Sequence, residues 1–95
     1  MKDFIVHLST NFDKKFKKLV KSNKALKKEI FKSLETLSSD PFYSSLRTHK
    51  VFHRVYGLSY SSRITGDIRI IWDFDDNNTM VIIALDIGGH DDVYR

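Results

Sequence analysis

The sequence predicts an α+β fold, a single domain over residues 1–95 in which an N-terminal strand and a helical hairpin pack on a largely antiparallel sheet. Apolar residues recur at helical spacing between residues 12 and 37. They alternate as in β-strands between residues 60 and 74, and a nearly uninterrupted apolar run follows at 79–87. A chain of this length buries about 60–65% of its unfolded surface, which is enough for one thin core.

The composition excludes several classes of protein. The chain has no cysteine, which excludes a disulfide scaffold and thiolate metal sites. No apolar run approaches the roughly 18 residues of a membrane span. The first ten residues, MKDFIVHLST, lack the apolar segment of a signal peptide. We therefore expect a cytoplasmic protein with no membrane partner.

Positive charge is concentrated in the first half of the chain. Residues 1–50 contain 12 Lys and Arg against five acidic residues, a net charge of +7, whereas residues 51–95 contain four Arg against seven Asp, a net charge of −3. A basic half of this size indicates a polyanionic partner that binds with release of counterions. The alternative is a lysine-rich helical surface that faces only water.

The first half of the chain predicts one strand and two helices. Residues 2–9 alternate as a strand, with His7 on the side of Ile5, where a packed or edge histidine is expected. Thr10 or Asn11 can cap a first helix, and Ser22-Asn23 a second. Each helix has one apolar stripe, formed by Phe12, Phe16, Leu19 and Val20 in the first and by Leu26, Ile30, Leu34 and Leu37 in the second.

Residues 41–57 show no clear period and are interpreted as a long loop. Loops of this length in compact domains are usually functional or mobile. This segment alternates cations with rings, which is the combination that single-stranded nucleic acid needs: Phe42, Tyr43, Arg47, His49, Lys50, Phe52, His53, Arg54 and Tyr56. The alternative is a loop whose rings lie under the sheet while its cations face water.

Residues 60–74 (YSSRITGDIRIIWDF) predict a β-hairpin with its turn at Gly66. In this register the apolar side chains share one face: Tyr60, Ile64, Ile68, Ile70, Trp72 and Phe74. A one-residue slip would mix apolar and polar side chains. Arg63 and Arg69 then lie directly opposite each other. Because like charges in this position destabilise a sheet, we expect an anion to bind between them.

Residues 79–87 (TMVIIALDI) predict a strand covered on both faces. A turn at Asp76-Asn77 places alternate residues in the core (Val81, Ile83, Leu85 and Ile87) and the others on the arginine face (Met80, Ile82, Ala84 and Asp86). Ala84 would then lie beside Arg69 and leave room for a ligand. The preceding acidic segment is interpreted as a turn, because Asn78 and Ala84 replace the glycine and glutamate of a calcium loop.

Six side chains with catalytic chemistry are expected on or near the arginine face: Arg63, Arg69, Asp67, His90, Tyr94 and, from the long loop, His49. Histidine can act as acid or base near neutral pH. Arginine offers a fork of donors to phosphate oxygens. These groups fit phosphodiester cleavage by an adjacent 2′-hydroxyl, which needs a base, an acid and cations for the phosphorane.

Each of these residues also has a structural interpretation. The two arginines would then pair with Asp67, Asp73 or Asp86 in an ion network, and His90 would simply be exposed. A metal site on His90 and its two neighbouring aspartates is disfavoured because adjacent residues rarely converge on one ion. We therefore expect no metal and no cofactor.

The hairpin sequence, followed by a buried strand and GGHDDVY, resembles the bacterial RelE/ParE toxin superfamily, and within it the YafQ/YoeB-like mRNA interferases. The patterns S-x-R-I-x-x-x-x-R-I and G-x-H-x-x-x-Y carry most of the resemblance. The upstream DPFYSSLRTHK is similar to a loop of the same branch. The resemblance spans the whole chain and implies a RelE-like β-α-α-β-β-β order.

The resemblance implies the toxin of a type II toxin–antitoxin system that cleaves mRNA on the ribosome without a metal and leaves a 2′,3′-cyclic phosphate. It implies that Arg63 and Arg69 bind the scissile phosphate, that His90 donates a proton and that Tyr94 stacks on or orients the nucleotide. A cognate antitoxin would neutralise the toxin in a hetero-oligomer. Messenger and ribosomal RNA would contact the lysine-rich helices and four residues of the long loop, Arg47, Lys50, His53 and Arg54.

The identity of the general base stays open between His49, Asp67 and His90. Arg63 replaces a histidine of YafQ-like members, and the loop glutamate of YoeB-like members has no counterpart. Two other functions are compatible with the same fold: a ParE-like toxin that inhibits DNA gyrase, and an inactive module that only binds an antitoxin. His90 and Tyr94 disfavour the first, since the ParE-like branch lacks the C-terminal catalytic histidine.

Overall fold

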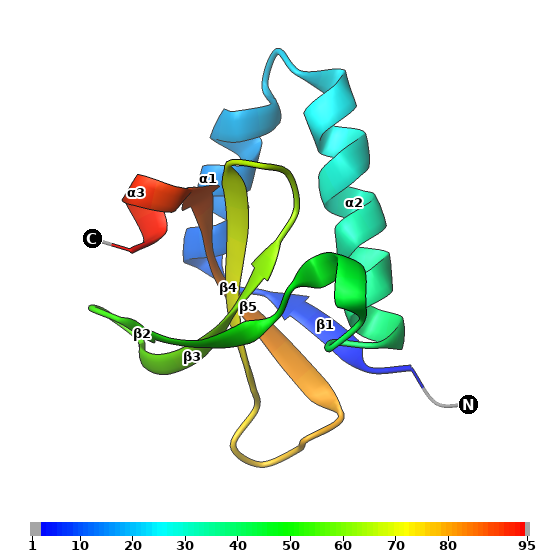
Figure 1. The fold of residues 1–95 in the computed structure, drawn as a ribbon, viewed down its shortest axis with the longest axis vertical. Coiled ribbons are helices and arrows are strands. Elements are labelled where there is room, and N and C mark those ends of the chain that lie inside the picture. The colour runs from blue at the N-terminus through cyan, green and yellow to red at the C-terminus, as the bar shows by residue number, and fades with distance from the viewer. Residues whose placement is uncertain (1–2, 95) are drawn as a thin grey trace.

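The computed structural model describes residues 3–94 as a five-stranded sheet with two helices on one face (Figure 1). The strand order is β1-β5-β4-β3-β2, and β1 pairs parallel with β5 while the other pairs are antiparallel. In chain order the elements are β1 (Ile5–Leu8), α1 (Thr10–Val20), α2 (Lys24–Ser39), the 3-10 turn η1 (Ser44–Leu46), β2 (His49–His53), β3 (Gly57–Arg63), β4 (Ile68–Phe74), β5 (Val81–Gly89) and α3 (His90–Val93). This arrangement confirms the predicted α+β class; Lys2 of the predicted first strand lies outside the described residues.

The two long helices begin at side-chain caps. The Ser9 hydroxyl accepts a hydrogen bond from Phe12 N at the start of α1, so the cap lies one residue before the predicted Thr10. Asn23 caps α2 through Leu26 N, as predicted. The helices run in opposite directions beside each other (Figure 1).

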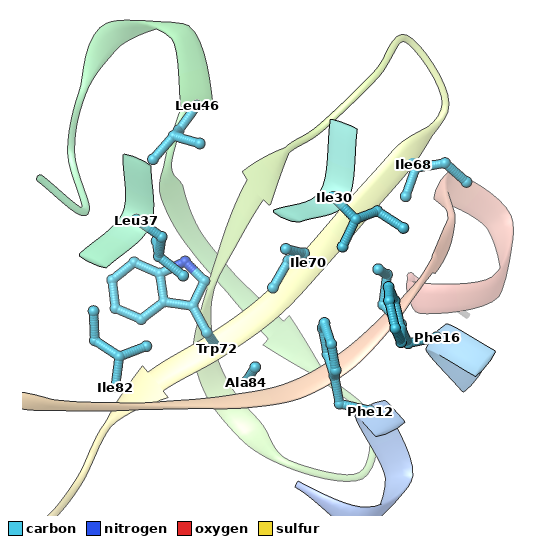
Figure 2. Packing of buried hydrophobic residues seen from close by; sticks show 11 residues of the cluster. Phe12, Phe16, Ile30, Leu37, Leu46, Ile68, Ile70, Trp72, Ile82 and Ala84 are labelled. Atoms are coloured by element: carbon cyan, nitrogen blue, oxygen red, sulfur yellow. The ribbon is translucent and has the colours of Figure 1, made fainter. Parts of the chain in front are cut away.

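The apolar stripes of both helices pack against the predicted apolar face of the hairpin. Trp72 lies in this core with no exposed surface (Figure 2). Its indole N–H donates to the Ser62 hydroxyl at 2.8 Å. The buried cluster comprises Phe12, Phe16, Ile30, Leu37, Leu46, Ile68, Ile70, Trp72, Ile82, Ala84 and Ile87. Both stripes predicted from helical spacing are therefore confirmed.

The segment predicted as a long loop contains a strand and a short helical turn. β2 pairs along its whole length with β3, with His49 opposite Ser61 and His53 opposite Gly57. β2 is an edge strand whose Phe52 is 74% exposed. Because the ring of Phe52 is exposed and not buried, β2 does not show the alternation of buried apolar and exposed polar residues that predicts a strand.

The predicted hairpin register is confirmed, whereas the predicted register of β5 is wrong. Arg63 lies opposite Arg69 and Tyr60 opposite Trp72. Between β4 and β5 the predicted turn centred on Asp76-Asn77 is replaced by a longer connection, in which Asp75 N donates to Val81 O at 2.8 Å. As a result Ala84 lies opposite Trp72 in the core.

After Ala84, a β-bulge in β5 returns the following residues to the sheet faces that were predicted for them. Trp72 pairs with Ala84 but Ile71 pairs with Asp86, so Leu85 is an extra residue in the strand. Asp86 therefore does lie on the arginine face, as predicted. The carbonyl oxygen of Leu85 accepts hydrogen bonds from Ser9 Oγ (3.2 Å) and Asn11 Nδ2 (2.9 Å), and these contacts fasten the start of α1 beside β5.

Part of the face opposite the helices is also covered. Ser59, Ser61, Ile71 and Asp86 on that face are each no more than 3% exposed. The β2–β3 turn covers Asp86 through His53, and the segment around α3 covers Ser61 through Tyr94. The arginine pair at the Gly66 end of the hairpin is only half-buried.

Candidate active site

The two arginines of the hairpin are held by carbonyl oxygens of the turn between them. Arg63 Nε donates to Thr65 O at 3.2 Å, and Arg69 Nη1 donates to the same oxygen at 2.9 Å. Arg69 Nη2 also reaches Gly66 O at 3.3 Å. The turn therefore orients both guanidinium groups and leaves other donor positions on each of them.

Within residues 3–94, no carboxylate lies within 4.0 Å of either guanidinium group. The structural alternative, pairing with Asp67, Asp73 or Asp86, is therefore not what the structure shows. Two uncompensated cations side by side form an anion-binding arrangement. The residue opposite Arg69 in β5 is Gly88 and not Ala84, and α3 packs on it, because a Cβ atom placed on Gly88 would lie 3.2 Å from Asp92 Cβ.

Asp67 connects the hairpin turn to α3. Its Oδ1 accepts a hydrogen bond from the backbone N–H of His90 at 3.4 Å. A Cβ atom placed on Gly89 would lie 3.1 Å from Asp67 Oδ2, so glycine is what allows this close approach. Asp67 therefore lies at the first residue of α3, next to the exposed His90.

His90 and Tyr94 form an edge-to-face pair. Their ring centroids lie 4.4 Å apart with an interplanar angle of 68°. The Tyr94 hydroxyl is hydrogen-bonded to the hydroxyl of the buried Ser61. The His90 side chain is 60% exposed and can reach a ligand from solvent.

His49 joins this group through the sheet. It lies opposite Ser61, and directly opposed residues of an antiparallel pair have Cβ atoms about 4.5–5.5 Å apart on the same face. Its Nδ1 lies 3.0 Å from the carbonyl oxygen of Arg47, a residue with a positive φ of 48° before β2. Arg63, Arg69, Asp67, His90, Tyr94 and His49 thus gather around the Gly66 end of the hairpin and α3.

The four predicted RNA contacts of the 41–57 segment do not lie together. Arg47 is exposed beside His49. Lys50 lies opposite Tyr60 and its ammonium group is 5.9 Å from that ring, on the other face of the sheet from His49. Arg54 is exposed in the β2–β3 turn.

His53 is buried, and both of its ring nitrogens are occupied. Val55 N and Tyr56 N donate to Nδ1 at 3.0 and 3.2 Å. The ring proton therefore lies on Nε2, which donates to Asp86 Oδ2 at 3.0 Å. His53 therefore holds the β2–β3 turn in place and has no free ring nitrogen with which to contact RNA.

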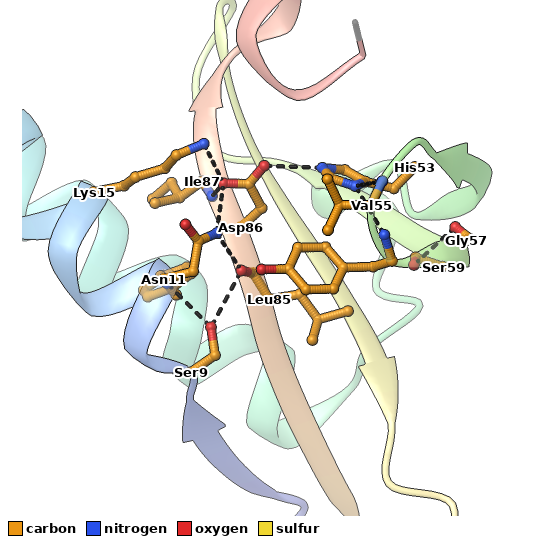
Figure 3. A network of polar contacts seen from close by, with 12 residues as sticks. Ser9, Asn11, Lys15, His53, Val55, Gly57, Ser59, Leu85, Asp86 and Ile87 are labelled. Atoms are coloured by element: carbon orange, nitrogen blue, oxygen red, sulfur yellow. Dashed lines mark hydrogen bonds and ion pairs between the residues drawn. The ribbon is translucent and has the colours of Figure 1, made fainter.

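Asp86 is the buried centre of a second polar cluster, which the sequence did not indicate as a functional site (Figure 3). Besides His53, it accepts hydrogen bonds from Lys15 Nζ at 2.7 Å and Asn11 Nδ2 at 3.2 Å. Burial by itself raises the pKa of the carboxyl. The hydrogen bonds from Lys15 and His53 outweigh that effect and hold the pKa below its ordinary value of 3.8.

A groove of about 540 Å³ adjoins this cluster. Lys15 and Lys18 of α1 line one side, Arg54 of the β2–β3 turn lines another, and Asp92 of α3 also contributes. α3 thus contributes to both sites, since His90 belongs to the first group and Asp92 to the groove. Sequence periodicity could not predict this groove, because α1 and the β2–β3 turn are distant in sequence and line it together only in the folded chain.

Two classes of feature are absent from the described part of the chain. No three His, Cys, Asp or Glu side chains of residues 3–94 gather in a way that could hold a metal ion. None of the helices within these residues is long and apolar enough to cross a membrane.

No model of a known protein family matches the chain, and no curated protein matches it in sequence. Solved structures do match it. The YoeB/ParE toxin from Agrobacterium tumefaciens superimposes with a TM-score of 0.72 at 11% identity, over 90% of this chain and 98% of the other. The chain has the RelE/YoeB-like toxin fold.

Two further structures give the same result. The toxin–antitoxin complex RelBE2 from Mycobacterium tuberculosis matches with a TM-score of 0.70 at 18% identity, over 95% of this chain and 94% of the other. YafQ from Escherichia coli strain BL21(DE3) matches with a TM-score of 0.67 at 19% identity, over 92% and 93%. The RelE/YoeB-like fold expected from the hairpin and GGHDDVY patterns is therefore confirmed, with a fifth strand, β2, in place of the predicted loop.

Proposed function

We propose that this chain is the toxin of a type II toxin–antitoxin system and acts as a metal-independent endoribonuclease on ribosome-bound mRNA. The observation that carries the proposal is the pair of cross-strand arginines with no carboxylate partner within residues 3–94, at the same end of the sheet as the His90–Tyr94 pair. The fold, shared with toxins and a toxin–antitoxin complex, supports the toxin assignment.

In this proposal Arg63 and Arg69 bind the non-bridging oxygens of the scissile phosphate. The turn carbonyls already fix the two guanidinium groups, so little reorganisation is needed as negative charge develops on the phosphorane. A base removes the proton of the 2′-hydroxyl, whose oxygen attacks phosphorus. His90 donates a proton to the departing 5′-oxygen, and the products are a 2′,3′-cyclic phosphate and a 5′-hydroxyl.

The base is His49 or Asp67, and their surroundings differ. His49 is exposed, and the hydrogen bond of Nδ1 to Arg47 O leaves Nε2 for a substrate hydroxyl. The Asp67 carboxylate accepts the backbone N–H of His90, which competes with a role as base. We therefore favour His49 as the base, with Tyr94 orienting the nucleotide.

The proposed partners follow from the distribution of charge. The exposed lysines of α1 and α2, together with Arg47, Lys50 and Arg54, would contact phosphates of messenger and ribosomal RNA. A cognate antitoxin would bind the toxin in a hetero-oligomer and suppress its activity. Both the toxin and its ribosomal substrate would be cytoplasmic.

The test is cleavage of a defined mRNA on translating ribosomes, with mapping of the product ends, beside growth arrest on induction. The variants are His90→Ala and Arg69→Ala. The matched control is His7→Ala, at an exposed histidine of β1. We expect the first two to lose cleavage and toxicity by about 100-fold or more while the control retains most of both. Full toxicity of both site variants, or gyrase inhibition without mRNA cleavage, would contradict the proposal.

A further inference from the structure

Ser61 is a polar residue at a position where the sheet would otherwise hold an apolar one. The Ser61 side chain has no exposed surface. Ser61 lies in β3 opposite Ile71 of β4, which is equally buried. Buried polar groups are retained where they form a hydrogen bond. The partner of the Ser61 hydroxyl is the hydroxyl of Tyr94.

Tyr94 contacts the imidazole of His90, whose Nδ1 also lies 3.7 Å from Asp91 Oδ1. Its backbone N–H donates to His90 O at 3.1 Å, and the two rings meet edge to face at 4.4 Å. α3 has only four residues and is too short to be stable by itself. The orientation of the His90 ring therefore depends on contacts that fix Tyr94 from outside the helix.

We propose that Ser61 is a positioning residue for His90, acting through the hydroxyl and ring of Tyr94. Ser61 contacts Tyr94, and Tyr94 contacts His90. This inference rests on the proposed function, in which His90 donates the proton. Ser61 itself lies beneath Tyr94 and fully buried, so it does not contact RNA. Deleting its hydroxyl releases the Tyr94 ring and loosens His90 without removing a group that contacts the substrate.

The chain offers a matched control for Ser61→Ala. Ser59 lies two residues earlier in β3 on the same face and is 3% exposed, but its hydroxyl donates to Gly57 O within its own strand. Ser59→Ala therefore removes a buried hydroxyl from the same strand without changing any contact of Tyr94. Thermal unfolding checks that both variants are folded.

The first measurement needs no substrate. In the nuclear magnetic resonance spectrum of the folded protein, we expect the adjacent Tyr94 ring to shift the signals of the His90 imidazole protons. We expect Ser61→Ala and Tyr94→Phe to move these signals in the same direction and Ser59→Ala to leave them in place. Unchanged His90 signals in Ser61→Ala would overturn the proposal, whether or not the protein cleaves RNA.

The second measurement is a double-mutant cycle on the single-turnover cleavage rate. We expect Ser61→Ala to lower the rate by about tenfold to 100-fold with little change in ribosome binding, since misplacement of a reacting group costs this much. In the Tyr94→Phe background, Ser61→Ala should lower the rate by less than about twofold, because the hydrogen bond is already gone. An equal loss in both backgrounds, or a rate equal to that of Ser59→Ala, would overturn the proposal.

The two measurements separate failure of this inference from failure of the proposed function. Absence of cleavage by the unaltered protein contradicts the nuclease, and the His90 signals then still decide the role of Ser61. Cleavage that is unaffected by Ser61→Ala leaves the nuclease in place and contradicts the positioning role.

Discussion

Arg63 and Arg69 donate to one and the same acceptor, the carbonyl oxygen of Thr65, at 3.2 and 2.9 Å. A single neutral oxygen orients two cations but cannot neutralise them. The hairpin therefore carries an electrostatic cost that a bound phosphate would relieve. If the arginine pair serves only to bind an anion, the fold does not need it. A measurement of protein stability can test this.

Replacing Arg69 with threonine should leave the fold intact and slightly strengthen it. Threonine suits a strand, and the change removes a like-charge cross-strand pair that costs a few tenths of a kcal/mol. The free energy of unfolding in urea should be unchanged or higher by about that amount at low salt, with a smaller difference at high salt. A loss of more than about 1 kcal/mol would show that Arg69 stabilises the sheet.

Asp86→Ala should destabilise the protein strongly. It leaves the His53 Nε2–H buried without an acceptor, which costs about 1–3 kcal/mol, and it also removes the partner of the half-exposed Lys15. The control is Asp13→Ala, which removes the exposed ion pair with Lys17 and should cost less than about 1 kcal/mol. Urea denaturation measures both, and equal losses would contradict the central role of Asp86.

The stability that Asp86 provides should disappear in acid. Its pKa is lowered in the folded protein, so folding favours the ionised form, and this contribution is fully present above the ordinary value of 3.8. As the pH falls through the folded-state pKa, the carboxylate is protonated and the contribution is lost. The difference in unfolding free energy between the unaltered protein and Asp86→Asn should be constant near neutral pH and shrink below pH about 4. A difference that grows in acid would give the pKa shift the opposite sign.

Ser62→Ala should destabilise the core by about 1–3 kcal/mol. The Trp72 indole N–H donates to Ser62 Oγ at 2.8 Å. Ser62 Oγ also lies 2.6 Å from Thr48 Oγ1, and Thr48 Oγ1 donates to Pro41 O at 2.7 Å. Since Thr48 uses its proton on a carbonyl, Ser62 must donate to Thr48. The change orphans a buried indole N–H and weakens the attachment of the segment before β2. Ser45→Ala, at an exposed position of η1, is the control for thermal unfolding and should have little effect.

The central hairpin could be predicted to the residue because one of its faces is apolar and the other polar. β5 could not, since it is apolar on both faces and its pattern therefore contains no information on register. A connection longer than the predicted turn moved Ala84 into the core, and the bulge then returned Asp86 to the predicted face. Alternation specifies a register only where the side chains on one face of a strand are mostly polar.

The predicted site residues came from local patterns, and the structure gathers six of them at the Gly66 end of the hairpin. The Asp86 cluster was missed because its members lie on α1, β2 and β5, more than 30 residues apart along the chain. His53 looked like an RNA contact for the same reason, since its buried partner is remote in sequence. Ser61 had no local signal, because its role depends on where Tyr94 returns to the sheet.

The extra residue in β5 bears on how such chains tolerate insertions and deletions during evolution. Removing Leu85 would leave every partner of β4 in place, since Ala84 and Asp86 already pair with consecutive residues, Trp72 and Ile71. It would remove the acceptor that Ser9 and Asn11 share. A one-residue gap here would therefore reposition a helix while the sheet kept its alignment, and descendants could change the lysine-rich surface without disturbing the arginine pair.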